Sequence, residues 1–200
     1  DRDDPDFVDP HKPVGPFYTE DEAKKIGEEN GWTVKHVRPS GDRQWRRVVP
    51  SPIPLGIVEG KAIKKMVDAG MIVIASGGGG IPVIKNDDGW LEGVDAVIDK
   101  DRAGSVLAKE VDADIFLVLT DVDCAKLDYG KPDERPIKRM TPAEAWKYSE
   151  EGHFLPGSMG PKVEACTRFV EDGGERSIIT SLAKAVDALK GEAGTTISQN

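Results

Sequence analysis

Short, uninterrupted apolar runs that alternate with helix-like segments constrain the fold of this chain more than any other feature. MIVIAS at residues 71–76 lies between glycines and is too short for a buried helix, and IFLVLT at residues 115–120 is a second such run. Strands that are apolar throughout are typical of parallel sheets with helices on both faces. We therefore predict an α/β fold with an open, mainly parallel sheet sandwiched by helices.

The remaining elements follow from capping, turn and periodicity signals. Thr141, Pro142 and Glu144 form an N-cap, a first-turn proline and a capping box for a helix. Further helices are expected at 57–69, 101–111, 161–171 and 182–189, and a hairpin at 81–94 that turns at Asn86–Gly89. Additional strands are expected in DAVIDK (95–100), RSIIT (176–180) and GTTIS (194–198).

The N-terminal fifty residues have a different character. Residues 1–18 carry four prolines and are expected to be extended. Thr19 and Glu22 predict a capped helix that ends at Gly31, and two strands should follow before Pro50. The expected domains are therefore an extended segment at 1–11, a small helix-plus-hairpin subdomain at 12–52, and an α/β domain at 53–200.

Composition narrows the class of protein. The net charge of −9 disfavours nucleic-acid binding, which needs a basic face. The two cysteines form neither a disulfide framework nor a zinc pattern, and the three histidines lack metal-ligand spacing, so we expect no protein-bound metal site. No membrane span or signal peptide is recognisable, and we expect a cytoplasmic protein.

Candidate functional residues follow the expected strands, because ligands of open α/β sheets bind at the carboxyl ends of strands. The glycine loop after MIVIAS could present backbone amides to an anion, although a plain tight turn remains the alternative. Lys100, between Asp99 and Asp101, could meet phosphate, or the carboxylates could simply cap a helix. Asp121 and Asp123 could cap a turn, contact a ribose or organise magnesium through water, and by themselves they are a weak signal.

Two further lysines complete the candidate site. Lys162 is expected in the first turn of a helix, where its charge opposes the helix dipole unless an anion joins both. Lys12 lies in a stiff proline-bounded segment, and from these residues alone a linker lysine is the favoured interpretation. The sequence thus offers lysines from distant segments, carboxylates and a glycine loop, but no nucleophile–base pair. This set favours phosphoryl transfer, in which the protein mainly positions the reacting groups and neutralises their charge.

Five segments resemble carbamate kinases of the amino-acid kinase family and occur in that family's order: DPHKPVGPFY, IASGGGGIPV, GVDAVIDKD, LTDVD and GSMGPKVEA. The resemblance implies an open α/β sheet, a protruding subdomain at residues 12–52, a homodimer, and the reaction ATP + carbamate ⇌ ADP + carbamoyl phosphate with Mg2+, as in arginine catabolism. It implies catalytic roles for Lys162, Asp101, Lys100 and Lys12. Implied nucleotide-binding residues are Lys100, Asp121, Asp123, Tyr129, Met159, Gly160 and Lys162, and the implied phosphate or substrate loop is Ser76, Gly77, Gly78, Gly79 and Gly80.

The chain begins where that family is already about a third of the way through, without its first glycine loops. We therefore expect a part of a longer enzyme, with a non-catalytic nucleotide-binding fragment or another amino-acid kinase as alternatives. MIVIAS and IFLVLT would then lack neighbouring strands, and self-association through exposed hydrophobic edges is expected.

Overall fold

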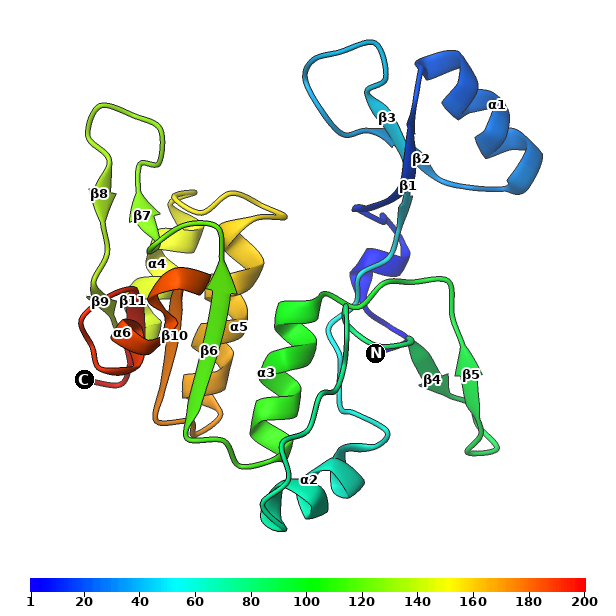
Figure 1. The fold of residues 1–200 in the computed structure, drawn as a ribbon. Helices are drawn as coiled ribbons and strands as arrows, with labels where there is room; N and C mark the ends of the chain where they lie inside the picture. The colour runs from blue at the N-terminus through cyan, green and yellow to red at the C-terminus, as the bar shows by residue number, and fades with distance from the viewer. The chain divides into compact units, whose positions relative to one another are not determined.

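The computed structural model describes residues 1–200, and contacts divide them into two compact units (Figure 1). The first unit comprises Asp1–Ile53 and Gly80–Asp99, and the second comprises Pro54–Gly79 and Lys100–Asn200. The boundary after Ile53 lies one residue from the expected one at 52. Gly80–Asp99, which the sequence analysis grouped with the second part, belongs by its contacts to the first unit.

The first unit is built on an antiparallel sheet with strand order β1-β3-β2. Its strands are β1 (Lys12–Tyr18), β2 (Val34–His36) and β3 (Trp45–Val49), preceded by the short turn η1 (Pro5–Phe7). Helix α1 (Glu20–Asn30) begins at a complete Thr19–Glu22 capping box and ends at Gly31, whose φ of 67° is left-handed. The helix and both later strands confirm the sequence analysis, because their signals are local.

A hairpin completes this unit. Strands β4 (Val83–Lys85) and β5 (Leu91–Gly93) pair antiparallel, and the turn closes through bonds between Asn86 and both Gly89 and Trp90, as expected. The strand expected in DAVIDK is wrong: residues 95–99 are irregular, and the amides of Ala96 and Val97 donate to the carbonyls of Val94 and Pro50.

The second unit contains a four-stranded sheet of order β6-β10-β11-β9. Strands β6 (Ile115–Thr120) and β10 (Arg176–Ser181) are parallel, β11 (Thr195–Ser198) runs antiparallel to β10, and β9 (Arg139–Met140) runs parallel to β11. Two of the three strand pairings are parallel and one is antiparallel, so the sheet is mixed but mainly parallel, as expected. A two-stranded ribbon of β7 (Lys126–Leu127) and β8 (Arg135–Pro136) lies in the long connection between β6 and β9.

Helices flank this sheet (Figure 1). Helix α5 (Met159–Glu171) packs on β10 and on α3 (Lys100–Glu110), and α4 (Pro142–Glu150) packs on α5. The Thr141–Glu144 capping box of α4 is present as expected. Helix α2 (Gly60–Asp68) starts three residues later than expected, and the expected helix at 182–189 is the short turn η2 (Leu182–Lys184) followed by α6 (Ala185–Leu189).

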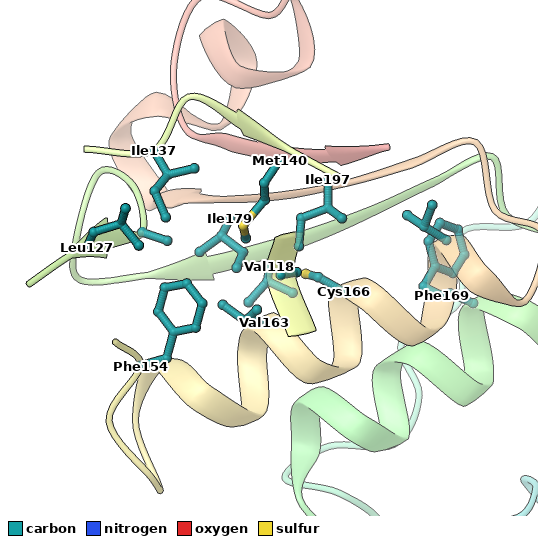
Figure 2. Close-up of a cluster of buried hydrophobic side chains, with 14 residues drawn as sticks. Val118, Leu127, Ile137, Met140, Phe154, Val163, Cys166, Phe169, Ile179 and Ile197 are labelled. Carbon is teal, nitrogen blue, oxygen red and sulfur yellow. The ribbon is translucent and has the colours of Figure 1, made fainter. Parts of the chain in front are cut away.

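The core of this unit lies between the sheet and α5. Figure 2 shows Val118, Ile179 and Ile197 of the sheet facing Val163 and Phe169 of α5. Each of these side chains is at most 5% exposed, and burying such a side chain contributes roughly 1.5–3 kcal/mol. This packing fixes the orientation and position of α5 on the sheet, and therefore the position of its first turn.

One expected strand is absent, and another is present but less buried than expected. MIVIAS forms no strand, and Ile72 and Ile74 are 99% and 98% exposed. IFLVLT forms β6, but β6 pairs only with β10, so it is an edge strand and Leu119 is 41% exposed. Both segments have the composition of interior strands, but burial needs neighbouring strands on both sides, which these 200 residues do not supply. No helix here has the length and apolar character needed to cross a bilayer.

Candidate functional site

The first turns of α3 and α5 bring one carboxylate and two ammonium groups together in the second unit. Lys162 Nζ lies 2.9 Å from Oδ2 of Asp101, and Lys100 Nζ lies 3.5 Å from the same oxygen. The side chains of Asp101 and Lys162 are 10% and 13% exposed, whereas that of Lys100 is 58% exposed. Asp101 therefore holds Lys162 in a nearly buried pair and leaves Lys100 facing solvent.

Local sequence explains why Lys162 lies here. Gly157 has a φ of 75°, which a residue with a Cβ rarely adopts, and it turns the chain into α5. A Cβ on Gly160 would lie 3.2 Å from the carbonyl oxygen of Leu155, a tight contact, and the Gly160 amide donates to that same oxygen at 3.0 Å. The helix starts at Met159 without a side-chain cap, two residues before the expected start.

The electrostatics of this arrangement favour an anion. Two ammonium groups outnumber one carboxylate, and two helix N-termini add partial positive charge beside them. A phosphate can accept hydrogen bonds from backbone amides and from ammonium groups at the same time. The start of α5 has no side-chain cap, so its backbone amides can contribute such bonds. We call Lys100, Asp101 and Lys162 the lysine–aspartate cluster.

An ion pair that the sequence analysis missed supports this cluster. Arg102 Nη2 lies 2.8 Å from Glu164 Oε2, and Glu164 Oε1 accepts a 3.0 Å bond from Arg168. The side chains of Arg102 and Glu164 are only 24% and 18% exposed. Because Arg102 follows Asp101 and Glu164 lies two residues after Lys162, this pair joins the same turns of α3 and α5. The only sequence signal for this ion pair is that Arg102 and Glu164 lie next to Asp101 and close to Lys162 in the chain.

Lys12 is placed in the first unit. Its Nζ lies 2.8 Å from Oδ2 of Asp99, and the Asp99 side chain is 8% exposed. Lys12 is therefore a fixed residue of β1 with a buried partner, rather than a solvated linker lysine. Each carboxylate that flanks Lys100 in the sequence thus bonds a lysine from a distant part of the chain.

The glycine loop has the backbone geometry of a tight turn. Ser76 and Gly77 have φ values of 62° and 48°, and the Gly79 amide bonds the Ser76 carbonyl at 2.8 Å. A Cβ at Gly77 or Gly78 would meet nothing within 4 Å, so crowding inside this structure does not require glycine there. The open space beside the backbone of Gly77 and Gly78 would allow a ligand to approach that backbone closely.

The carboxylates after β6 differ from one another. Asp121 is exposed and accepts a 3.0 Å bond from the Thr120 hydroxyl. Asp123 is paired with Lys184 at 2.8 Å and with the Ser181 hydroxyl at 2.7 Å, and chiefly the Lys184 contact holds the pKa of Asp123 below its usual value. Asp123 thus ties the loop after β6 to the end of β10, a connection the sequence analysis did not foresee.

The segment that carries Tyr129 is anchored at its base. The buried Thr195 hydroxyl donates to Ile137 O at 2.6 Å and accepts from Ala125 N at 2.8 Å. Tyr129 itself is 57% exposed, with Lys126 Nζ 5.7 Å from its ring centre. An exposed aromatic ring on a pinned segment can stack on a planar ligand.

A three-ligand metal centre is absent: no cluster of three or more His, Cys, Asp or Glu side chains has suitable geometry. Magnesium binds proteins through one or two carboxylates plus substrate phosphates and water. The exposed Asp121 fits that role, so a magnesium ion would arrive with the phosphates of its ligand rather than in a preformed cage.

Comparisons with known proteins identify the family of this chain. Residues 22–181 match the amino acid kinase family. The chain is 58% identical to a carbamate kinase of Thermococcus kodakarensis and 57% identical to one of Pyrococcus furiosus, each over 98% of this chain. It spans 61% and 62% of the length of those relatives. A carbamate kinase structure from Giardia lamblia bound to AMP-PNP superposes with a TM-score of 0.88 at 47% identity, covering 100% of this chain and 62% of that one.

Proposed function

The chain belongs to the amino acid kinase family, and on that premise we propose that it is the nucleotide-binding portion of a carbamate kinase. The reaction is ATP + carbamate ⇌ ADP + carbamoyl phosphate. The single observation that carries the proposal is the lysine–aspartate cluster at two adjoining helix starts. It has the charge and the donors that a transferring phosphoryl group needs.

In the proposed mechanism the chain positions groups and neutralises charge. A carbamate oxygen forms a bond to the γ-phosphorus of ATP as the bond from that phosphorus to the β,γ-bridging oxygen breaks. Lys162 stabilises charge on the transferring phosphoryl oxygens, Lys100 binds neighbouring phosphate oxygens, and Asp101 orients both ammonium groups. We assign Lys12 to carbamoyl phosphate and the Ser76–Gly80 loop to phosphate contacts.

The nucleotide is assigned to the loop after β6 and the start of α5. Tyr129 is proposed to lie against the base or ribose, with Asp121, Met159 and Gly160 nearby, and magnesium to accompany the phosphates. Asp123 contributes by holding the loop through Lys184 rather than by direct contact. The Giardia lamblia relative bound to AMP-PNP supports an adenine nucleotide. A cytoplasmic homodimer that acts in arginine catabolism completes the proposal.

A coupled assay tests this function by measuring ATP formed from ADP and carbamoyl phosphate. The protein that carries this sequence should form ATP, and Lys162→Ala should lower kcat by ~100-fold or more while the fold persists. Lys147→Ala is the matched control, because Lys147 is an exposed lysine of α4. Near-normal turnover of Lys162→Ala would remove Lys162 from the mechanism.

The same assay separates the alternative functions. Nucleotide binding by residues 1–200 without turnover would identify this part as a binding module that needs the rest of its enzyme. Phosphoryl transfer to glutamate, with none to carbamate, would replace the carbamate kinase assignment by another amino-acid kinase.

A further inference from the structure

The face of the second unit's sheet that points away from α5 carries a cavity that meets the proposed nucleotide site only through Asp123 and Lys184, the pair that holds the loop after β6. Side chains alternate between the two faces of a strand. Ile179 and Ile197 belong to the core beside α5, and the Ser177 hydroxyl bonds the Cys166 carbonyl of α5 at 2.9 Å. Arg176 and Thr196, one position away from these residues, therefore point to the opposite face.

Strand register places further charge on that face. Arg139 is the direct partner of Thr196, and Met140, which points into the core, is the partner of Ile197. Neighbouring residues in register share a face of the sheet, so Arg139 lies on the same side as Thr196. Helix α6 has only five residues and packs on β10, so it leaves the surface over β11 and β9 open.

The space left beside α6 has a volume of about 550 Å³. Ligand pockets for small molecules fall in the range of roughly 300–1,000 Å³. Its lining includes four cationic side chains, namely Lys138, Arg139, Arg176 and Lys184, against the two carboxylates of Asp123 and Glu192. Asp123 is already neutralised by Lys184, so three cations face one carboxylate. This excess contrasts with a chain whose net charge is −9.

Arg176 adds an independent observation. Its Nη2 donates to the carbonyl of Leu189 at the end of α6 at 3.3 Å, and its Nη1 lies 4.0 Å from Glu175. Its Nε is buried and has no hydrogen-bond partner. Because Nε is buried, an anion in the cavity would meet the Nη groups of Arg176, whose side chain is 34% exposed and is held in place by the Leu189 carbonyl.

We propose that this cavity binds a small phosphate-bearing metabolite at a site separate from the lysine–aspartate cluster. Arginine suits such a ligand because its planar guanidinium can bond two phosphate oxygens at once. The Gly191–Gly194 loop, which also lines the cavity, supplies backbone near the ligand. The cavity lies at the β10–β11–β9 end of the sheet, whereas the unpaired edge of β6 lies at the other end.

Isothermal titration with inorganic pyrophosphate tests the proposal in a Lys162→Ala background, which weakens the lysine–aspartate cluster. Pyrophosphate should still bind, and adding Lys138→Gln and Arg139→Gln should lower that affinity by ~10-fold or more. Both residues are exposed, so these substitutions should leave the thermal midpoint unchanged. Lys190→Gln, an exposed lysine outside the cavity lining, is the matched control and should have no effect.

Backbone amide chemical shifts give a second readout that does not depend on those variants. Pyrophosphate should shift the amides of Gly191 and Gly194 in the Lys162→Ala protein. No binding in that background, or an affinity unchanged by Lys138→Gln and Arg139→Gln, would overturn the proposal. Either result leaves the phosphotransferase assignment untouched, because that assignment is tested by turnover.

Discussion

The carboxylate of Asp101 is the shared ion-pair partner of Lys100 and Lys162. Its Oδ2 faces ammonium groups from its own helix and from a helix that begins 58 residues later in the chain, at Met159. Two lysines this close would repel one another without a shared counterion, and the carboxylate also limits where each nitrogen can lie. At the residue scale, the candidate site is one buried anion that keeps two cations ready for a phosphate.

Cys166 gives a prediction at the same scale. It is fully buried in the core, and burial raises the pKa of its thiol from 9.0 to about 12. The thiolate is the reactive species, so native protein at pH 8 should not be alkylated at Cys166 by iodoacetamide, whereas urea-unfolded protein should be. Peptide mass spectrometry would detect the adduct, and its formation in the native state would contradict this packing.

The raised pKa also predicts how stability depends on pH. Between pH 9 and about 12 the folded chain keeps a proton that the unfolded chain has lost. The free energy of unfolding should therefore fall as pH rises, by up to about 1.4 kcal/mol per pH unit from this group. Cys166→Ala removes this contribution, so urea titrations at pH 8.5 and 10.5 should show a smaller decline in the variant.

Elements with local signals were predicted correctly from the sequence. The caps at Thr19 and Thr141 and the hairpin turn at Asn86–Gly89 depend only on residues within a few positions, and each is present. The strand expected at 71–76 failed because its burial depends on neighbours that hydrophobicity alone cannot identify. The rule that ligands bind at strand ends selected Asp101, and the helix-dipole argument selected Lys162, which lies 61 residues away. Neither argument revealed the partner of Lys12, which lies 87 residues away.

The α3–α5 contact carries a prediction at the element scale. Arg102 and Glu164 join the helix turns that bear Asp101 and Lys162. Arg102→Ala and Glu164→Ala should each lower the free energy of unfolding. The double variant should lose about 1 kcal/mol less than the sum of the two single losses, because each single substitution already removes the same ion pair. Urea unfolding of the four proteins measures this coupling energy, and additive losses would show that the pair does not join the helices energetically.

At the scale of the whole molecule, exposed apolar segments dominate the expected behaviour. Ile72 and Ile74 are almost fully exposed, and β6 has one unpaired edge. Such surfaces are templates for pairing with a second chain. These observations fit a chain that spans 61% of the length of its curated relative from Thermococcus kodakarensis.

We therefore predict that residues 1–200 self-associate in solution. Ile72→Lys with Ile74→Lys should shift the average mass in light scattering towards the monomer at 21.7 kDa. Val8→Lys with Leu55→Lys is the matched control, since it changes two other exposed apolar residues and alters the net charge equally. A monodisperse, cooperatively unfolding wild-type monomer would contradict the prediction.

The most direct test of the account is a comparison of AMP-PNP and AMP binding by calorimetry in Lys100→Ala, Lys162→Ala and the double variant. If Lys100 and Lys162 hold the same terminal phosphates, each substitution should lower the affinity for AMP-PNP by ~10-fold or more. The effects of the two substitutions on that free energy of binding should not be additive, and the affinity for AMP should not change. Equal losses for both nucleotides, or strictly additive losses for AMP-PNP, would contradict a shared phosphate site.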